Sequence, residues 1–105
     1  MTSVYAQVEP ARTQIDALER PAVIEFGAPW CGYCEAAQPL LGAALANFPS
    51  IAHVKIEDEK GCPLGRSFRV TLWPTLIFLK DGKEVARLVR PTDSTAINEA
   101  LARTT

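Results

Sequence analysis

The stretch Ala22-Val23-Ile24-Glu25-Phe26-Gly27-Ala28-Pro29-Trp30-Cys31-Gly32-Tyr33-Cys34 decides the fold of this sequence. It begins as a compact apolar run, which is typical of a buried central strand. After Cys34 the apolar positions recur every three or four residues, which is the period of a helix. Two cysteines separated by two residues therefore stand where a strand has ended and a helix begins.

The position of Cys31 at a helix start has a chemical consequence. Its sulfur would face the unpaired backbone N–H groups and the positive end of the helix dipole, which favour thiolate over thiol. Cys34 follows on the same face, close enough to close a small ring with Cys31. An exposed attacking thiolate with a more buried resolving thiol behind it is what disulfide exchange requires. Zinc sites also use Cys-x-x-Cys, but the strand and helix on either side favour redox chemistry.

The rest of the chain predicts alternating strands and helices in one domain over residues 1–105. We expect strands at Val4–Val8, Ala22–Phe26, Ile51–Ile56, Thr75–Lys80 and Glu84–Val89, and helices at Pro10–Leu18, Cys31–Phe48, within Gly61–Val70 and from Thr92 onward. Asp81-Gly82 is the strongest hairpin signal. The order β-α-β-α-β-α-β-β-α predicts an α/β fold, with a mixed central sheet flanked by helices on both faces.

Composition narrows the class of protein. The chain has 105 residues, 48% of them hydrophobic, and a formal net charge of −1. These values are typical of one globular domain and give no broad field for nucleic acid or an acidic membrane. No stretch approaches the ~20 apolar residues of a membrane helix, and no basic leader precedes an apolar run. We therefore expect a bacterial-type cytoplasmic enzyme, monomeric, without nucleic-acid or membrane partners.

Motifs beyond the opening stretch complete a resemblance to a known family. Phe26–Cys34, then Pro39 in the helix, then Trp73-Pro74-Thr75 before the hairpin resemble the thioredoxin superfamily in order and separation. The resemblance covers nearly the whole chain and implies a thioredoxin fold. It also implies a thiol–disulfide oxidoreductase that reduces protein disulfides through Cys31 and Cys34. The implied partners are protein disulfide substrates and a thioredoxin reductase. The redox group is the cysteine pair itself, with no dissociable cofactor and no metal.

The resemblance also implies which residues meet the substrate. Pro74 matches a cis-proline beside the cysteine pair, and such a bond turns the backbone groups of Trp73 outward to pair with an extended substrate segment. Trp30 matches a position that shields the cysteines and contacts partners. Gly32 and Tyr33, between the cysteines, belong to the same surface. The alternative for the two tryptophans is ordinary core packing.

Glu25 matches the buried carboxylate that the family places beneath the resolving cysteine. Thioredoxins usually have Asp there, and protein disulfide isomerase domains have Glu. Burial makes a carboxylate a better proton acceptor, which suits deprotonation of Cys34. His53 aligns with a Lys that many members pair with this carboxylate, so we hypothesise a coupled proton-transfer pair of His53 and Glu25. The alternatives are a Glu25 satisfied by water and a His53 satisfied by backbone groups.

The dipeptide Gly32-Tyr33 leaves the direction of exchange open. Reducing thioredoxins typically have Gly-Pro there, and periplasmic disulfide isomerases often have Gly-Tyr. Tyr restores an N–H that Pro lacks, which would give the Cys31 thiolate another donor and make the protein more oxidising. Thioredoxin and disulfide isomerase differ by roughly 90 mV, or about 4 kcal/mol for two electrons. A reductase is the expectation, with an oxidase or isomerase as the alternative.

Two more residues need an interpretation. Arg90 stands where thioredoxins have Gly after the last strand, and a bulky cation beside the substrate groove is expected to narrow the range of partners. Cys62 has no Cys neighbour, so it is interpreted as a lone thiol, with a regulatory or intermolecular disulfide as the alternative. A zinc site is another competing interpretation, since the chain has four zinc-type ligands in Cys31, Cys34, Cys62 and His53, but Cys62 and His53 do not supply a second pair at a zinc-site spacing. A thioredoxin-fold scaffold with incidental redox activity is the other competing function.

Overall fold

The computed structural model describes residues 1–59 and 61–105. Four strands form one sheet in the order β2-β1-β3-β4. The strands are β1 (Ala22–Gly27), β2 (Ala52–Glu57), β3 (Thr75–Lys80) and β4 (Lys83–Val89), and the helices are α1 (Arg12–Asp16), α2 (Gly32–Leu45), α3 (Pro63–Ser67) and α4 (Ser94–Ala102). β1 runs parallel to β2 and antiparallel to β3, which is antiparallel to β4. The predicted mixed sheet is confirmed.

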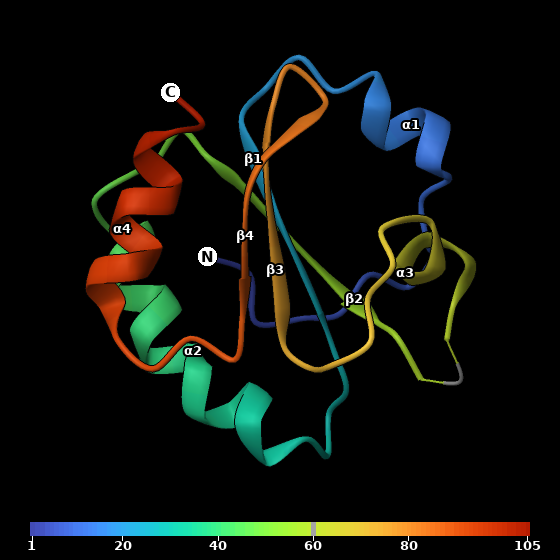
Figure 1. Cartoon of the computed structure of the whole chain (residues 1–105), viewed down its shortest axis with the longest axis horizontal. Helices are drawn as coiled ribbons and strands as arrows, with labels where there is room; N and C mark the ends of the chain where they lie inside the picture. The colour runs from blue at the N-terminus through green and yellow to red at the C-terminus, as the bar shows by residue number, and fades with distance from the viewer. Residues whose placement is uncertain (60) are drawn as a thin grey trace.

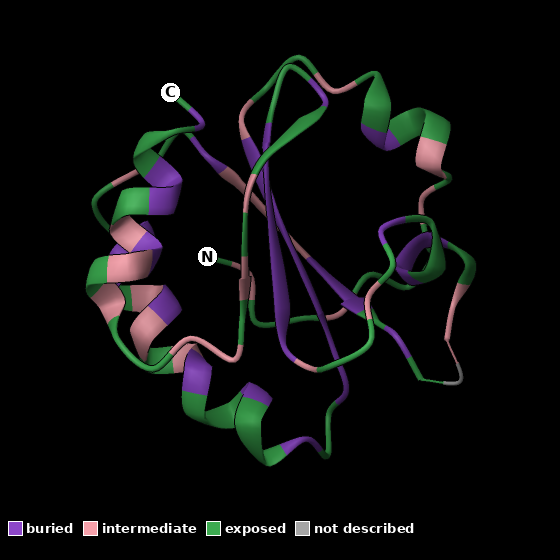
Figure 2. Cartoon of the chain, viewed as in Figure 1, coloured by how far each residue is buried: buried purple, intermediate pink, exposed green. Residues whose placement is uncertain are grey.

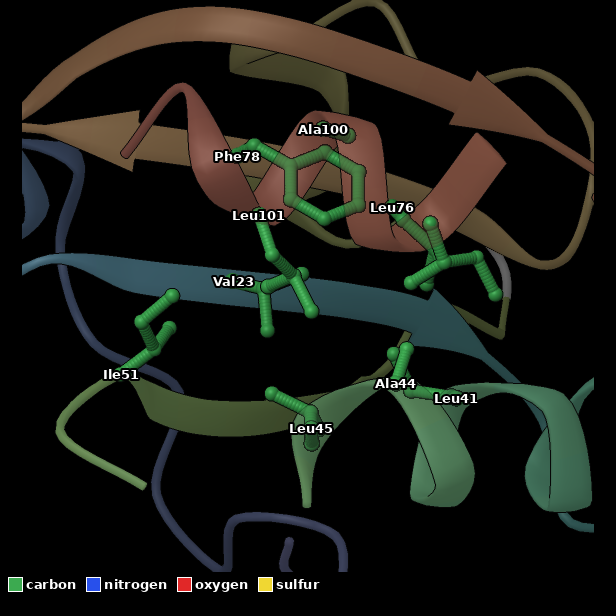
Figure 3. Close-up of a cluster of buried hydrophobic side chains, with 10 residues drawn as sticks. Val23, Leu41, Ala44, Leu45, Ile51, Leu76, Phe78, Ala100 and Leu101 are labelled. Atoms are coloured by element: carbon green, nitrogen blue, oxygen red, sulfur yellow. The ribbon is translucent and has the colours of Figure 1, made fainter. Parts of the chain in front are cut away.

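Helices cover both faces of this sheet, as predicted (Figure 1). α2 and α4 pack on one face, against a buried cluster that includes Val23, Leu76 and Phe78 (Figure 3). α1 and α3 pack on the other face, where Ile24 and Ile77 are buried. Neighbouring residues of a strand point to opposite faces, so β1 and β3 each supply both cores. Both strands are consequently buried along nearly their whole length (Figure 2).

The helix that carries the cysteines is shorter than the predicted range Cys31–Phe48. Cys31 is the N-cap, and its sulfur accepts the backbone N–H of Cys34 at 3.2 Å. At the other end the amide of Phe48 bonds to the carbonyl of Leu45 at 2.9 Å, a contact three residues back that tightens and ends a helix. The helix begins shortly after the end of β1 in the chain, so the fold places the cysteine pair at the carboxyl end of a central strand.

The hairpin between β3 and β4 forms where the sequence predicts it. Asp81 and Gly82 have φ values of 52° and 75°. Positive φ at both positions gives a two-residue turn the twist of the strands that it joins. Gly82 is also required by packing, because a Cβ there would collide with the backbone of Asp16.

The predicted first strand, Val4–Val8, was wrong. This segment forms one parallel bridge, between Tyr5 and Lys55, and one backbone bond from Ala6 to the Lys55 carbonyl at 2.8 Å. Val4 is 64% exposed and Val8 is 83% exposed, so the alternating apolar residues do not face a core. The segment follows β2 at the edge of the sheet. β2, predicted as a buried strand, is half-buried over Ala52–Val54, in keeping with its place as an edge strand.

The other helices lie within or close to their predicted ranges. α1 begins after Ala11, whose N–H is held by the side chain of Gln14 at 2.7 Å. α4 begins after Asp93, whose carboxylate accepts the N–H of Ala96 at 2.9 Å, as an N-cap does. Across the part of the chain that the structure describes, none of the helices has the length and apolar character needed to cross a bilayer.

We expect Leu41→Ala to lower the free energy of unfolding by about 2–5 kcal/mol. Leu41 is fully buried between α2 and the sheet, so its truncation removes apolar burial and leaves a cavity. Urea unfolding followed by circular dichroism measures the change. Leu72→Ala is the matched control: Leu72 is 47% exposed. Its loss should stay within about 0.5 kcal/mol. Equal losses in the two variants would contradict this description of the core.

Candidate active site

Cys31 and Cys34 lie together at the N-terminus of α2, both as thiols. Cys31 is 7% exposed and Cys34 is 2% exposed, so Cys31 is the more accessible of two largely buried sulfurs. The Cys31 sulfur also lies 4.0 Å from the backbone oxygen of Trp73, which belongs to the distant segment before β3. The order of accessibility agrees with an attacking Cys31 and a resolving Cys34.

The additional donor expected from Tyr33 does not reach the Cys31 sulfur. An N-cap side chain can accept from the second or the third amide of its helix. Here the sulfur accepts from the third, that of Cys34, at 3.2 Å. Within residues 1–59 and 61–105, no other backbone N–H donates to it. The Gly32-Tyr33 dipeptide therefore adds no hydrogen bond to the attacking sulfur.

Cys34 is held in its protonated form. Burial raises the pKa of Cys34 to about 12, and the hydrogen bond to Cys31 and the negative charge of Glu25 act in the same direction. A thiol with this pKa needs a base before it can act as a nucleophile. A cavity of about 80 Å³, lined by residues that include Gln38 and Lys55, reaches Cys34. This volume is large enough to admit water.

Glu25 is fully buried in β1, and both of its carboxylate oxygens have protein partners. His53 Nε2 lies 2.9 Å from Oε1, and Gln38 Nε2 donates to Oε2 at 2.7 Å. The backbone N–H of Thr2 donates to Nδ1 of His53 at 3.2 Å. A neutral His53 ring therefore carries its hydrogen on Nε2 and donates it to Glu25. The structure brings the hypothesised pair together, and His53 also contacts a backbone group.

Gln38 is a residue of this network that the sequence interpretation missed. Besides Glu25, its side-chain amide donates to the carbonyl of Cys34 at 2.9 Å. It therefore ties the first turn of α2 to the buried carboxylate. The spacing in the sequence could have indicated this contact, because Gln38 stands one helical turn after Cys34 on the same face of the helix.

Lys55 is a second missed residue. It is 6% exposed, and it pairs with Glu25 in the register of β1 and β2. Its Nζ donates to the side-chain oxygen of Gln38 at 3.3 Å and lies 4.6 Å from the ring centroid of Tyr5. Lys55 stands two residues after His53, so strand alternation alone places both on one face. A cation thus lies beside the carboxylate network.

The aromatic residues around the cysteines form an exposed rim. Trp30 is 67% exposed and Tyr33 is 60% exposed, which contradicts core packing for Trp30. Gly32 is exposed as well. The ring of Trp30 meets that of Trp73 edge to face, with centroids 5.5 Å apart. Trp73 is half-buried, and its peptide bond to the buried Pro74 is cis. Trp73 packs against the two cysteines, and Trp30, Gly32 and Tyr33 adjoin them in the chain.

Asp58 anchors this rim, and the sequence interpretation missed it too. It is 3% exposed and directly follows β2. One carboxylate oxygen accepts the indole N–H of Trp73 at 2.9 Å, and the other accepts the thiol of Cys62 at 2.9 Å. A Cβ on Gly65 would collide with this carboxylate. Cys62 therefore packs behind the rim as a thiol partner of Asp58.

Arg90 lies beside the cysteine pair, as its position in the sequence predicts. Its φ of 49° is one that glycine adopts readily, in keeping with the Gly that thioredoxins have at this place. Its Nε donates to the backbone oxygen of Trp73 at 2.9 Å, and its guanidinium carbon lies 3.9 Å from the ring centroid of Tyr33. The Trp73 carbonyl, which the resemblance turns outward toward a substrate, therefore already accepts one side-chain donor and keeps a second lone pair.

The four zinc-type ligands do not gather at one place. Cys62 contacts Asp58, whereas His53 contacts Glu25. Among the described residues, no three or more His, Cys, Asp or Glu side chains form a group that could hold a metal ion.

A helix start with one thiol that caps the helix and a more buried thiol held protonated is suited to dithiol–disulfide exchange. On a mixed sheet of this topology, it defines a thiol–disulfide oxidoreductase of the thioredoxin-fold class. Comparison with known proteins makes the assignment specific. The Thioredoxin family profile matches residues 4–103, and the chain belongs to the thioredoxin family.

Individual relatives agree with this assignment. The chain is 33% identical to thioredoxin of Chlamydia trachomatis over 81 residues, which are 77% of this chain and 79% of the relative. Thioredoxin H2 of Arabidopsis thaliana is 33% identical over 64% of this chain, and the match spans 50% of that longer relative. The solved structure of thioredoxin 2 from Pseudomonas aeruginosa in its reduced form superposes with a TM-score of 0.87. The identity there is 48%, and the match covers 99% of this chain and 96% of that chain. The predicted family and enzyme class are confirmed.

Cys62 should be a slowly reacting thiol at ordinary pH. Burial raises its pKa to about 12, and the hydrogen bond to Asp58 adds to the effect. Because the thiolate is the nucleophile, the alkylation rate of Cys62 should still rise with pH beyond about pH 10. We would measure iodoacetamide labelling in a Cys31→Ser, Cys34→Ser double variant. Asp58→Asn, added as a control, should shift the profile to lower pH. A plateau near pH 9 in the double variant would contradict this.

Proposed function

We propose that this protein reduces protein disulfides by dithiol–disulfide exchange, with Cys31 as the nucleophile and Cys34 as the resolving thiol. The observation that carries the proposal is the asymmetry of the pair. The Cys31 sulfur caps a helix and accepts a backbone N–H, whereas the more buried Cys34 has its pKa raised to about 12. We place the protein in the cytoplasm as a monomer, a setting that keeps thiols reduced.

In the first step the Cys31 thiolate attacks one sulfur of a substrate disulfide. A bond forms between Cys31 and that sulfur, the substrate disulfide breaks, and the other substrate sulfur leaves as a thiolate that takes up a proton. The helix N-terminus stabilises the negative charge on Cys31 before the attack. The proposed substrate surface consists of the residues beside the cysteine pair, namely Trp30, Gly32, Tyr33, Trp73 and Pro74.

In the second step Glu25 accepts the proton of Cys34, and the Cys34 thiolate attacks the Cys31 sulfur. The mixed disulfide breaks, the Cys31–Cys34 disulfide forms, and the second substrate thiol is released. The substrate has gained two electrons and the cysteine pair has lost two. The support for Glu25 as the base is its burial beside Cys34 and its link through Gln38 to the Cys34 turn. His53 is the proposed positioning residue, since it donates to Glu25.

The oxidised pair then has to be reduced again. In thioredoxins a thioredoxin reductase reduces the active-site disulfide, and we propose the same general kind of partner here. The competing oxidase or isomerase function has two grounds, the Gly32-Tyr33 dipeptide that periplasmic disulfide isomerases often share and an additional donor to Cys31 from Tyr33. Among the described residues, that donor does not reach the sulfur. Reduction is therefore the direction that we propose.

Replacing either cysteine should separate the two steps. Cys31→Ser removes the nucleophile and should abolish insulin reduction in an assay with dithiothreitol or with NADPH and thioredoxin reductase. Cys34→Ser keeps the attack but should accumulate a mixed disulfide, which mass spectrometry detects. Cys62→Ser is the control and should retain activity. Full activity of Cys31→Ser would remove Cys31 from the reaction, and a wild-type protein that does not reduce insulin would leave only a scaffold function. A wild-type reduction potential near −180 mV instead of about −270 mV would favour the isomerase direction.

Glu25→Gln should slow the resolving step by about 10²–10⁴-fold near pH 7, the usual contribution of a general base. The first attack should keep its rate. Cys34 has a pKa of about 12. Below that pKa its thiolate fraction rises tenfold per pH unit, so the defect should shrink as pH rises. Rapid-mixing kinetics of substrate thiol release would measure both steps.

Two further variants complete this test. Glu99→Gln is the control, because Glu99 is an exposed carboxylate on α4, and it should leave both rates unchanged. His53→Ala should alter the pH–rate profile of the resolving step. An unchanged profile would remove His53 from the mechanism, and an unslowed Glu25→Gln variant would remove Glu25.

A further inference from the structure

Arg90 touches two parts of the proposed substrate surface at once. It follows β4, and the segment between β4 and α4 passes beside α2 (Figure 1). Its Nε bonds to the Trp73 oxygen at 2.9 Å, and that oxygen lies 4.0 Å from the Cys31 sulfur. Its guanidinium also stacks on the exposed ring of Tyr33, 3.9 Å from the centroid. A single side chain therefore lies across the approach to the nucleophile.

The Arg90 guanidinium has no carboxylate partner in the described residues. Other arginines of this chain do: Arg12 pairs with Asp16, and Arg87 pairs with Glu84 through two hydrogen bonds. A guanidinium has five N–H donors in a planar fork that matches a carboxylate. Among the described residues, only Nε of Arg90 has an acceptor, so the two terminal nitrogens are available to a ligand.

A groove beside Arg90 offers room for that ligand. It has a volume of about 490 Å³, and its lining residues are Tyr33, Ala36, Leu40, Arg90, Pro91 and Thr92. Arg90 is the one charged side chain among these lining residues. An extended substrate segment that lies in this groove and reaches Cys31 would therefore contact mainly uncharged residues of the groove, together with the Arg90 cation.

We propose that Arg90 is a specificity-determining residue, and that it selects disulfide substrates with a carboxylate side chain next to the attacked cysteine. This inference rests on the proposed disulfide reduction. A substrate segment that pairs with the second lone pair of the Trp73 carbonyl lies beside the guanidinium. A carboxylate in that segment gives the terminal nitrogens of Arg90 a two-point, charge-assisted partner. A neutral segment desolvates these nitrogens without giving them a partner and therefore binds with a penalty.

The test compares two synthetic disulfide peptides that differ at one position. One has Glu next to the attacked cysteine, and the other has Gln. The rate of the first step is measured by rapid mixing with the reduced wild-type protein. We expect the Glu peptide to react about tenfold faster, which corresponds to a difference of 1.4 kcal/mol. The ratio should shrink as salt is added, because the contact lies at the surface.

Three variants separate the charge of Arg90 from its effect on the backbone. Arg90→Gly and Arg90→Met should both bring the ratio to within about twofold, and Arg90→Lys should keep part of it because a point charge replaces the fork. Arg90→Met keeps a side chain at this positive-φ position, as Arg does. That variant therefore still provides the test if Arg90→Gly does not fold. Arg69→Gly is the matched control. Arg69 has a φ of 57° and is exposed, and its one hydrogen bond among the described residues is to the backbone of Arg66, so its loss should leave the ratio at the wild-type value.

The possible outcomes are distinct. If the wild-type protein reduces neither peptide, the proposed function fails, and this inference fails with it. If it reduces both peptides at equal rates, disulfide reduction stands and the selection of acidic segments is wrong. A preference that survives in Arg90→Met is also against the inference, since another group would then recognise the carboxylate.

Discussion

A carboxylate that is removed from water in the middle of a sheet has to receive hydrogen bonds from the protein, because an unpaired buried charge is strongly destabilising. Glu25 is such a group, and its two donors come from different elements: Gln38 of α2 and His53 of β2. Satisfying Glu25 therefore fixes the position of α2 over β1 and beside β2. Since Gln38 also holds the carbonyl of Cys34, the same requirement fixes the first turn of the cysteine helix.

In the proposed mechanism, the contacts that satisfy Glu25 also serve the chemistry of the cysteine pair. Burial keeps the resolving thiol protonated until a base is available, and the same burial places the carboxylate close to it. His53 faces this carboxylate with one ring nitrogen and the backbone of Thr2 with the other. Lys55 adds a cation through Gln38. In the proposed mechanism, stability and catalysis thus depend on one connected set of polar groups, so a change in one member acts on both.

On the other side of the pair, two departures from the usual thioredoxin sequence explain each other. Tyr33 replaces the proline that reducing thioredoxins carry between the cysteines, and Arg90 replaces a glycine after the last strand. In the folded protein the Tyr33 ring is the surface on which the Arg90 guanidinium stacks. Neither residue alone indicates this contact, because they are far apart in the chain. Together they give the rim of the site a cation that an ordinary thioredoxin lacks there.

Local patterns in the sequence determined the buried strand before Cys31, the helix that the cysteine caps, the Asp81-Gly82 hairpin and the alternation of strands and helices. These features depend on the period of apolar residues and on the conformational preferences of single residues, which a sequence displays directly. Only the tertiary structure decided that Val4–Val8 forms a single bridge, that Gln38 and Asp58 hold the site, and that Arg90 occupies the Trp73 carbonyl. Each of these depends on which distant segments lie at an edge or face one another. Periodicity cannot specify that choice, because strand order, register and the path of each loop set it.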